Sequence, residues 1–384
     1  MQPVYLDNNA TTRPLDTVVQ VFSAHLREAW GNPGSGHTFG RSARRDLSAA
    51  RRRIADRLGV APAEVVITSG ATESNNLALR GVLGDGKGHL VTTAVEHPAV
   101  LDCARRLERR GRCDLDVIGV DANGVLDLAA LEASLRPGRT RLVSVMAANN
   151  ETGVLFPLAE IRRITREAGI LLHVDAVQAI GRTDIDLAAV GADLVSLSAH
   201  KFHGPKGVGL LTVPRSLDLE PLLVGGGQER GRRSGTENPA AVVAMALALE
   251  TALDSAAESL PRIAALRDRF ERALLERIDG IRVTGAGAPR NANTSHLTVA
   301  GVEAEALLLR LDREGIACSV GSACSTGALE PSHVLRAMGV ADDRVHGALR
   351  FSLSRFSTDA EIDRVVEVLP GIVTGLRALT TDRG

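Results

Sequence analysis

The segment "ADLVSLSAHKFHGPKGVGLLTV" (residues 192–213) contains two short apolar runs separated by a polar turn. Each run, "ADLVSLS" (192–198) and "GVGLLTV" (207–213), has the length and composition of a buried strand. Four similar runs precede them: "EVVIT" (64–68), "HLVTT" (89–93), "RLVSVM" (141–146) and "ILLHVDA" (170–176). Helical patterns separate many of the runs, so the sequence predicts an α/β fold with a mostly parallel sheet covered on both faces.

The helical patterns, and a change in the residue pattern from about residue 240, suggest two domains. In "PLAEIRRITREAG", Leu158, Ile161 and Ile164 fall on one helical face and Gly169 offers a stop. A long Ala/Leu/Arg-rich stretch (240–278) reads as a helix with a break at Pro261, and it leads into "IRVTG", "TSHLTVAG", a helix and "ALRFSLSRF". We expect a large domain at residues 16–255 and a smaller α+β domain formed by residues 1–15 with 256–384.

The charge and composition of the chain argue against several classes of function. The formal net charge of −1 over 384 residues gives no reason to expect direct binding to nucleic acid or to a membrane, and the basic run "RRLERRGR" (105–112) reads as the solvated face of a helix. No segment reaches the roughly 18 apolar residues that a bilayer requires, and the first residues do not resemble a signal peptide. The expectation is a cytoplasmic protein whose four cysteines are thiols and form no metal site.

Lysine is rare in this chain and therefore informative. Lys87, Lys201 and Lys206 are the only lysines among 45 basic residues. An arginine keeps its proton, whereas a partly desolvated lysine can be neutral and form an imine with an aldehyde. Lys201 follows a predicted strand directly, while Lys206 lies beyond Pro205 in a turn and reads as a surface charge. Lys201 is therefore the predicted nucleophile.

Polar groups follow five of the six apolar runs, and the carboxyl ends of parallel strands form the ligand-binding edge of such a sheet. This pattern places the following residues around one rim: Thr72, His97, Asn150, Asp175, Gln178, Ser198, His200 and Lys201.

Three of these positions together suggest a cofactor. "TSGATES" (68–74) is a strand, a turn and a helix start that suits a phosphate, although an ordinary helix cap fits it as well. Asp175 ends an apolar strand and needs a cationic partner or a site, unless it caps a helix. A lysine nucleophile, a phosphate site and a strand-end carboxylate are the contacts that pyridoxal 5′-phosphate requires.

The segment "GIACSVGSACSTGALEPSHVLRAMG" (315–339) adds a possible second nucleophile. Cys324 has small and polar neighbours that cannot bury it, which predicts an exposed, reactive thiol. Cys318 reads as a small packed residue, and Cys103 and Cys113 read as structural residues in or near the arginine-rich helix.

In this order, the motifs resemble the NifS/IscS-type (class I) cysteine desulfurases, a branch of the fold-type I pyridoxal-phosphate enzymes. The resemblance runs nearly from end to end and rests on "YLDNNATT", "GNPGSGH", "TSGATESNN", "VEHPAVL", "NNETG", "HVDAVQ", "SLSAHKFHGPKGVG", "GGGQERGRRSGTEN", "GSACSTG", "EPSHVLRAMG" and "ALRFSLSRF". It implies a homodimer that converts L-cysteine to L-alanine, holds the sulfur on Cys324 as a persulfide and passes it to an acceptor protein.

The resemblance also implies roles for individual residues. Lys201 would carry the cofactor, Asp175 would pair with the ring nitrogen, Gln178 and Asn150 would hydrogen-bond the ring hydroxyl, and His97 would stack on the ring as an acid/base. The phosphate ligands would be Ala71 through its backbone, Thr72, Ser198, His200, and Thr236 of the neighbouring subunit. Arg350 and Asn32 would hold the substrate carboxylate.

Several alternatives remain open. The same fold could carry a selenocysteine lyase, another lyase, an aminotransferase or a kynureninase-like hydrolase, and a more remote possibility is a non-catalytic scaffold of a sulfur-transfer complex. Enzymes of this type supply iron-sulfur proteins, tRNA thiolation and DNA phosphorothioation. The preference for arginine over lysine suggests a GC-rich bacterial genome. The character of the sequence from "YLDNNATTRP" to "SVGSACSTG" suggests the desulfurase of a bacterial DNA phosphorothioation system.

Overall fold

The central feature of the fold is a seven-stranded sheet with the order β2-β8-β7-β6-β5-β3-β4. The structure is a computed structural model that describes residues 3–320 and 331–381. The strands of the sheet are β2 (Val65–Thr68), β3 (Gly88–Thr93), β4 (Cys113–Ile118), β5 (Thr140–Met146), β6 (Leu171–Asp175), β7 (Leu194–Ser198) and β8 (Gly209–Thr212). Neighbours from β7 to β4 pair in parallel, and β8 runs antiparallel to both β2 and β7. All six predicted runs are strands, and the expected α/β fold with a mostly parallel sheet is confirmed.

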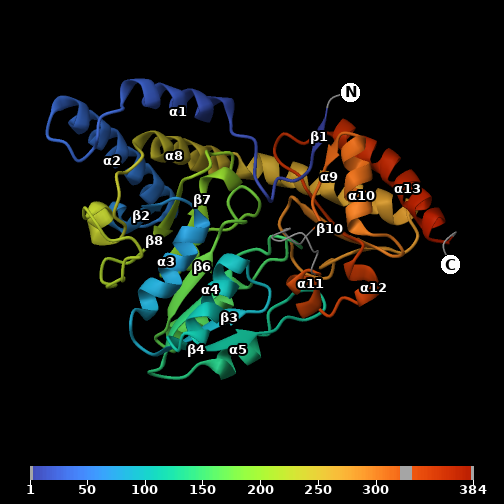
Figure 1. Ribbon diagram of the computed structural model, residues 1–384, viewed down its shortest axis with the longest axis horizontal. Helices are drawn as coiled ribbons and strands as arrows, with labels where there is room; N and C mark the ends of the chain where they lie inside the picture. Colours follow the sequence, from blue (N-terminus) through green and yellow to red (C-terminus); the bar gives the residue numbers. More distant parts are fainter. Residues whose placement is uncertain (1–2, 321–330, 382–384) are drawn as a thin grey trace.

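Helices cover both faces of this sheet (Figure 1). One face packs against α3 (Ala71–Leu83) and α4 (Pro98–Arg109). The other face is covered by α1 (Asp16–Glu28), α2 (Thr38–Leu58), α5 (Leu128–Ser134), α6 (Leu158–Glu167), α7 (Leu187–Val190) and α8 (Pro239–Asp254). Leu158, Ile161 and Ile164 of α6 are buried as predicted, and Gly169 after it has a φ of 68°. Short 3-10 turns occur at Pro62–Glu64, Ala199–Lys201 and Gln228–Gly231.

A second hydrophobic core lies around an antiparallel sheet with the order β12-β10-β9. Its strands are β9 (Ile281–Val283), β10 (Thr294–Val299) and β12 (Ala348–Ser352), and α9 (Ala256–Arg277), α10 (Ala304–Arg313) and α13 (Asp359–Thr381) pack around them. The short elements β1 (Val4–Tyr5) and β11 (Ile316–Ala317) pair in parallel beside this core, and α11 (His333–Ala337) and α12 (Asp342–Val345) follow. The N-terminal strand therefore joins the chain's C-terminal part (Figure 1).

Cys113 lies near the arginine-rich helix, as expected: the helix ends at Arg109 and Cys113 begins strand β4. One local expectation from the sequence was wrong. The long helix breaks at Ser255 and not at Pro261, which lies inside α9. The Ser255 hydroxyl donates to the Thr251 carbonyl (2.7 Å) and closes the end of α8, whereas Pro261 lies within α9 and does not end it.

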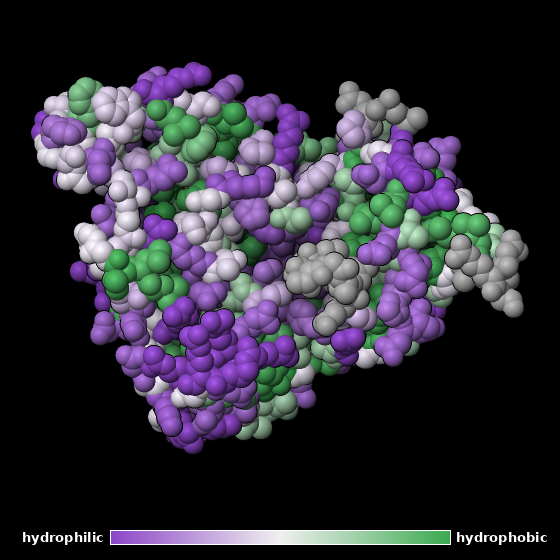
Figure 2. Space-filling model, in the orientation of Figure 1, coloured by the Kyte–Doolittle hydropathy of each residue, from purple (hydrophilic) through white to green (hydrophobic). Residues whose placement is uncertain are grey.

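The basic run on α4 lies where the sequence placed it. Arg105, Arg106, Arg109 and Arg110 are exposed, while Leu107 between them is buried. Figure 2 shows hydrophilic residues gathered over the region of α4 and β4. This run is the solvated face of a helix, as predicted.

No single helix within the described ranges is long and apolar enough to cross a membrane. Only α8 and α9 taken together meet a test of length and composition, and they are bent by 70° relative to each other. Most residues of α8 are buried in the core of the large sheet.

A buried ion pair fixes the loop at residues 225–236 against the edge of the large sheet. Arg51 of α2 donates from both terminal nitrogens to Glu229, at 2.7 and 2.6 Å. Glu229 also accepts the Ile67 N–H at the free edge of β2 (3.2 Å). Glu229 and Arg230 have φ values of 50° and 59°, a left-handed backbone that only strong local contacts sustain.

Replacing Glu229 with Gln should destabilise the protein, because Arg51 would keep a buried charge without a counter-ion. We expect the free energy of unfolding to fall by about 3 kcal/mol, measured by urea unfolding with circular dichroism. Glu167→Gln is the matched control, because Glu167 pairs with Arg163 on the exposed surface and should change little. Equal effects of both substitutions would contradict the role given to the buried pair.

Candidate active site

The two faces of the large sheet differ in polarity. Val143, Val145, Leu172 and Val174 point into the core on one face. On the opposite face, the His173 ring contacts the hydroxyls of Ser144 (2.8 Å) and Ser196 (2.9 Å). Burial lowers the pKa of His173 to about 3, so its imidazole is neutral. The same face carries Asp175 at the carboxyl end of β6.

Asp175 is a buried carboxylate that is held by neutral donors. Its Oδ2 accepts from Asn75 Nδ2 of α3 (2.7 Å) and its Oδ1 accepts the Val177 N–H (3.1 Å). Residues 177–182 form turns, so Asp175 does not cap a helix. No ion pair joins Asp175 to a cation in the described part of the chain. A buried carboxylate without a counter-ion is suited to a cationic ligand group.

Lys201 lies in the tight turn directly after β7. Its Nζ donates to the main-chain carbonyls of Asn9 (2.6 Å) and Ala10 (2.9 Å). Burial, with a contribution from nearby guanidinium groups, lowers the pKa of Lys201 to about 7. A substantial share of this amine is therefore neutral near pH 7, as a nucleophile requires. Lys206, in contrast, is exposed.

The chain around Lys201 leaves little steric freedom. His203 has a φ of 67° and donates its N–H to the Thr12 hydroxyl (2.8 Å). A Cβ at Gly204 would lie 2.8 Å from the Cβ of Ala199, so only glycine fits there. The motif "HKFHGPKG" therefore forms a compact turn that fixes the direction of the Lys201 side chain.

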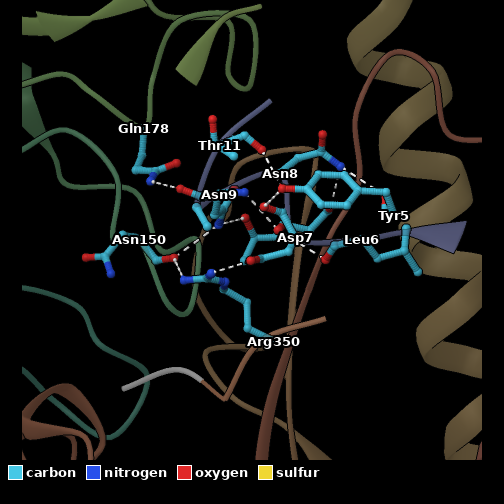
Figure 3. A network of polar contacts seen from close by, with 12 residues as sticks. Tyr5, Leu6, Asp7, Asn8, Asn9, Thr11, Asn150, Gln178 and Arg350 are labelled. Carbon is cyan, nitrogen blue, oxygen red and sulfur yellow. Dashed lines mark hydrogen bonds and ion pairs between the residues drawn. The ribbon is translucent and has the colours of Figure 1, made fainter. Parts of the chain in front are cut away.

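Residues 7–12 form an arm that crosses the site between the two cores. Gln178 Nε2 donates to the Asn9 carbonyl (3.0 Å), and Asn9 Nδ2 donates to the Asn150 carbonyl (3.1 Å). Figure 3 shows these side chains and Arg350 converging on the arm. The sequence interpretation gave residues 7–12 no role, although "YLDNNATT" was among the motifs, because their partners lie more than a hundred positions away.

The start of α3 forms a second part of the site. The helix begins at Ala71 after Gly70, whose φ is 154°, and no side chain caps this end. Gly70 lies so close to Gly209 that a Cβ on Gly209 would be 2.7 Å from the Gly70 Cα. Thr72 is exposed in the first turn, and Ser198 lies beside Gly70. An uncapped helix start with adjacent hydroxyls suits an anion such as a phosphate.

Two histidines lie near Lys201. His200 Nδ1 is 3.1 Å from the Thr11 hydroxyl, and burial lowers the pKa of His200 to about 4. His97 begins α4, where its Nδ1 accepts the Ala99 N–H (3.0 Å). Partial desolvation lowers the pKa of His97, as does Lys201, while Asp175 raises it. His97, Asp175 and Lys201 therefore influence one another electrostatically.

Arg350 reaches the site from β12. Its Nη1 donates to the Asn150 carbonyl (3.1 Å) and its Nη2 to Asp7 (2.7 Å), while its buried Nε has no partner among the residues described. Next to Asn150, Glu151 accepts a hydrogen bond from Ser332 (2.6 Å), and burial raises the pKa of Glu151 to about 7. Arg350 thus has donor capacity available for an anionic ligand.

Two predicted site residues are not joined to this cluster, and a third lies outside the part of the chain that the structure describes. Asn32 and Thr236 are exposed, and the contact described for the Asn32 side chain is with the Gly34 N–H (2.8 Å). Cys324 lies outside the described residues. Cys103, Cys113 and Cys318 are buried free thiols, and burial raises the pKa of Cys318 to about 12.

Together these features fit pyridoxal 5′-phosphate. The amine of Lys201 suits an aldehyde, the unpaired Asp175 carboxylate suits a protonated ring nitrogen, and the uncapped start of α3 suits a phosphate. The sheet, the second core and these positions are those of a fold-type I pyridoxal-phosphate enzyme.

Comparison with known proteins gives the family. Residues 4–365 match the family model described as "Aminotransferase class-V", and the chain belongs to this pyridoxal-phosphate-dependent family. A relative from Nostoc sp., named cysteine desulfurase, is 46% identical over 382 residues, which is 99% of this chain and 95% of the relative. The cofactor and the family expected from the sequence are confirmed.

Solved structures agree with this assignment. A NifS-like protein superposes with a TM-score of 0.90 at 37% identity, covering 98% of this chain and 100% of the other. DndA from Streptomyces lividans gives a TM-score of 0.76 at 35% identity, covering 91% of this chain and 99% of the other.

Glu96, beside His97, is a site residue that the sequence did not single out. Its Oε1 accepts from the Thr93 hydroxyl (2.8 Å) and the Met146 N–H (2.9 Å), and its buried Oε2 has no partner among the described residues. Burial raises the pKa of Glu96 from 4.5 to about 8, and Asp175 adds to the rise. Glu96 is therefore protonated at neutral pH.

Glu96→Gln should make stability less sensitive to alkali. The pKa of Glu96 is raised by folding, so its contribution is fully present below pH 4.5 and is lost as the pH rises through about 8. Gln stays neutral, and we expect the Tm of the variant to exceed that of the parent by at least ~2 °C at pH 9, with a smaller difference at pH 5. Thermal unfolding from pH 5 to 9 measures this, with the exposed Glu160→Gln as control. Parallel curves for the parent and Glu96→Gln would refute the assignment.

Proposed function

We propose that this protein is a cysteine desulfurase, a sulfurtransferase that converts L-cysteine to L-alanine. The observation that carries the proposal is the buried Lys201 amine, with a pKa of about 7, in electrostatic contact with the unpaired Asp175. The full-length likeness to relatives named cysteine desulfurase supports the choice of substrate. A selenocysteine lyase, another lyase or an aminotransferase on this fold is less favoured, because the chain keeps Cys324 in the "GSACSTG" segment.

The roles that we propose for the cofactor-binding residues are those that the family resemblance implies, and the positions of Lys201, Asp175 and the start of α3 support them. Lys201 would bind the aldehyde carbon, Asp175 would hold the proton on the ring nitrogen, and His97 would lie against the ring. Hydrogen bonds to the ring hydroxyl come from Gln178 and Asn150. The phosphate ligands are the Ala71 N–H, Thr72, Ser198, His200 and Thr236 of a second copy. When bound, the cofactor supplies an electron sink for charge that develops at the substrate α-carbon.

The remaining steps belong to the chain's own residues. Arg350, with Asn32, binds the carboxylate of L-cysteine and thereby orients its α-carbon toward Lys201. The Lys201 amine moves the α-proton, and the Cys324 thiolate attacks the substrate sulfur. A sulfur–sulfur bond forms as the carbon–sulfur bond breaks, and protons complete the balance: L-cysteine and the Cys324 thiol give L-alanine and a Cys324 persulfide.

We further propose that the enzyme is a cytoplasmic homodimer with domains at 16–255 and at 1–15 plus 256–384. Thr236 supports the homodimer, because it is exposed and separate from its own chain's cluster. The sulfur acceptor is proposed to be a protein. Likeness to DndA favours a DNA phosphorothioation system, and an iron-sulfur protein is the alternative. Co-purification of the native protein with its acceptor distinguishes the two.

Cys324→Ala should abolish desulfuration without removing the cofactor. We expect alanine formation from L-cysteine to fall at least about 100-fold, because the other three thiols, Cys103, Cys113 and Cys318, are buried. The absorbance of the Lys201-bound cofactor should persist, and Cys113→Ala, which removes a buried thiol, is the control. Alanine formation that survives in Cys324→Ala would point to a different lyase. Purified protein that neither shows cofactor absorbance nor forms alanine would point to a scaffold.

Mixing two inactive variants tests the shared site. A Lys201→Ala chain and a Thr236→Ala chain form one intact site in each mixed dimer, if Thr236 acts on the partner's phosphate. After subunit exchange at equal amounts, activity should recover to about a quarter of the parent value. Thr236→Ala alone should release the cofactor more readily, as dialysis and absorbance would measure. Absence of recovery, with exchange verified by mass spectrometry, would show that Thr236 serves its own chain.

A further inference from the structure

Arg182 is a buried cation without a carboxylate partner. It lies in the turn after β6 with an exposed fraction of 4%. Its acceptors are neutral oxygens: the Gln178 side-chain carbonyl, the Asn8 main-chain carbonyl (2.7 Å) and the main-chain carbonyl of Lys201 itself (2.8 Å). None of the described ion pairs includes Arg182. Because a buried charge without a counter-ion is costly, this position calls for a physical explanation.

The three acceptors belong to three separate parts of the site. Gln178 is proposed to hold the ring hydroxyl, Asn8 belongs to the arm, and Lys201 is proposed to hold the aldehyde carbon. The planar guanidinium of Arg182 thus holds the Gln178 side chain, the arm and the backbone of Lys201 in fixed positions relative to one another. The Arg182 main chain adds a fourth link, since its carbonyl accepts the Ala292 N–H (2.7 Å).

Arg182 and Lys201 hold the same arm in different ways. Lys201 Nζ contacts the carbonyls of Asn9 and Ala10, and it must leave them to reach an aldehyde. The contact between Arg182 and Asn8 does not involve Nζ and persists when Lys201 changes partner. The contact with Arg182, like that of Gln178 with the Asn9 carbonyl, therefore attaches the arm independently of the Lys201 amine.

The charge of Arg182 also acts on the Lys201 amine. Burial is the largest cause that lowers the pKa of Lys201, followed by Arg182 and Arg350, whereas Asp175 and Asp7 raise it. Arg350 is paired with Asp7 (2.7 Å), so its charge is partly offset. The charge of Arg182 has no such partner among the described residues, and its effect on the amine is not cancelled locally.

We propose that Arg182 is a positioning residue for Lys201, whose uncompensated charge keeps the amine in its nucleophilic neutral form while its fork anchors the arm. The inference rests on the proposed function, since it explains how Lys201 is prepared for an aldehyde. It assigns Arg182 no contact with substrate or cofactor. A purely structural Arg182 would affect stability but leave the protonation of Lys201 unchanged.

The rarity of lysine makes a direct test possible. The full chain, freed of cofactor, is acetylated with limiting acetic anhydride from pH 5.5 to 9.5, and the three lysines are quantified by peptide mass mapping. Lys87 and Lys206 are exposed and serve as internal references. Arg182→Gln removes the charge and Arg182→Lys retains it. Arg262→Gln is the matched control, because Arg262 also donates to main-chain carbonyls, those of Ser357 (2.8 Å) and Arg355 (2.6 Å).

We expect Arg182→Gln to shift the midpoint of Lys201 acetylation upward by about one pH unit, which lowers the neutral fraction severalfold at pH 7. Arg182→Lys and Arg262→Gln should keep the parent profile, and the reference lysines should not change in any variant. Should Arg182→Gln fail to fold, Arg182→Met provides the same loss of charge without a new polar group.

A Lys201 profile that is identical in the parent and the charge-removing variant would overturn the proposal. An equal shift in Arg182→Lys would also overturn it, because the charge would then not be the cause. The readout uses neither substrate nor cofactor. Failure of alanine formation would therefore count against the proposed function and would leave the result on Arg182 intact.

Discussion

The side chains of Lys201 and Arg182 and the carbonyl groups of one short arm make the contacts on which the site depends. Lys201 and Arg182 both enter the space between the two cores, and main-chain oxygens of residues 8–10 receive their hydrogen bonds. Neutral oxygens satisfy the donors of a cation without stabilising its charge as a carboxylate would. The amine of Lys201 is therefore held in position and remains easy to deprotonate, which a salt bridge would prevent.

This arrangement requires the particular connection of the chain. The arm can cross the site only because β1 pairs with β11 beside the second core, while β6 and β7 present their carboxyl ends from the large sheet. Successive side chains of a strand point to opposite faces of the sheet, so neighbouring residues of β6 and β7 serve different purposes. Val174 and Leu197 bury their side chains on one face, and Asp175 and Ser196 on the other supply the polar lining under α3. Packing and chemistry are thus separated by strand geometry.

The sequence predicted the sheet and much of the rim because those signals are local. Each apolar run is complete within a few residues, and the polar group that follows it needs no distant information. Strand β4 was missed because its pattern, CDLDVI, is half exposed and follows the helix after only a short turn. The roles of Asn9 and Arg182 were missed because their partners, such as Lys201, lie far along the chain, and no local pattern encodes such a contact. Asn32 and Thr236 remain predictions, since a single chain does not join them to the cluster.

The protonation states explain why so polar a site can be buried. Glu96 and Glu151, with pKa values raised by burial, and His173, with its pKa lowered by burial, all favour their neutral forms. Burial also favours the neutral form of the Lys201 amine, whose pKa is lowered to about 7. Asp175 differs from these groups in its contacts, because its two carboxylate oxygens accept hydrogen bonds from Asn75 and the Val177 N–H. Because no ion pair among the described residues holds this carboxylate, its charge can act strongly on a ligand in a medium of low polarity. A ligand whose ring nitrogen can take up a proton gains most from that charge, and this selects the protonated form of the ring.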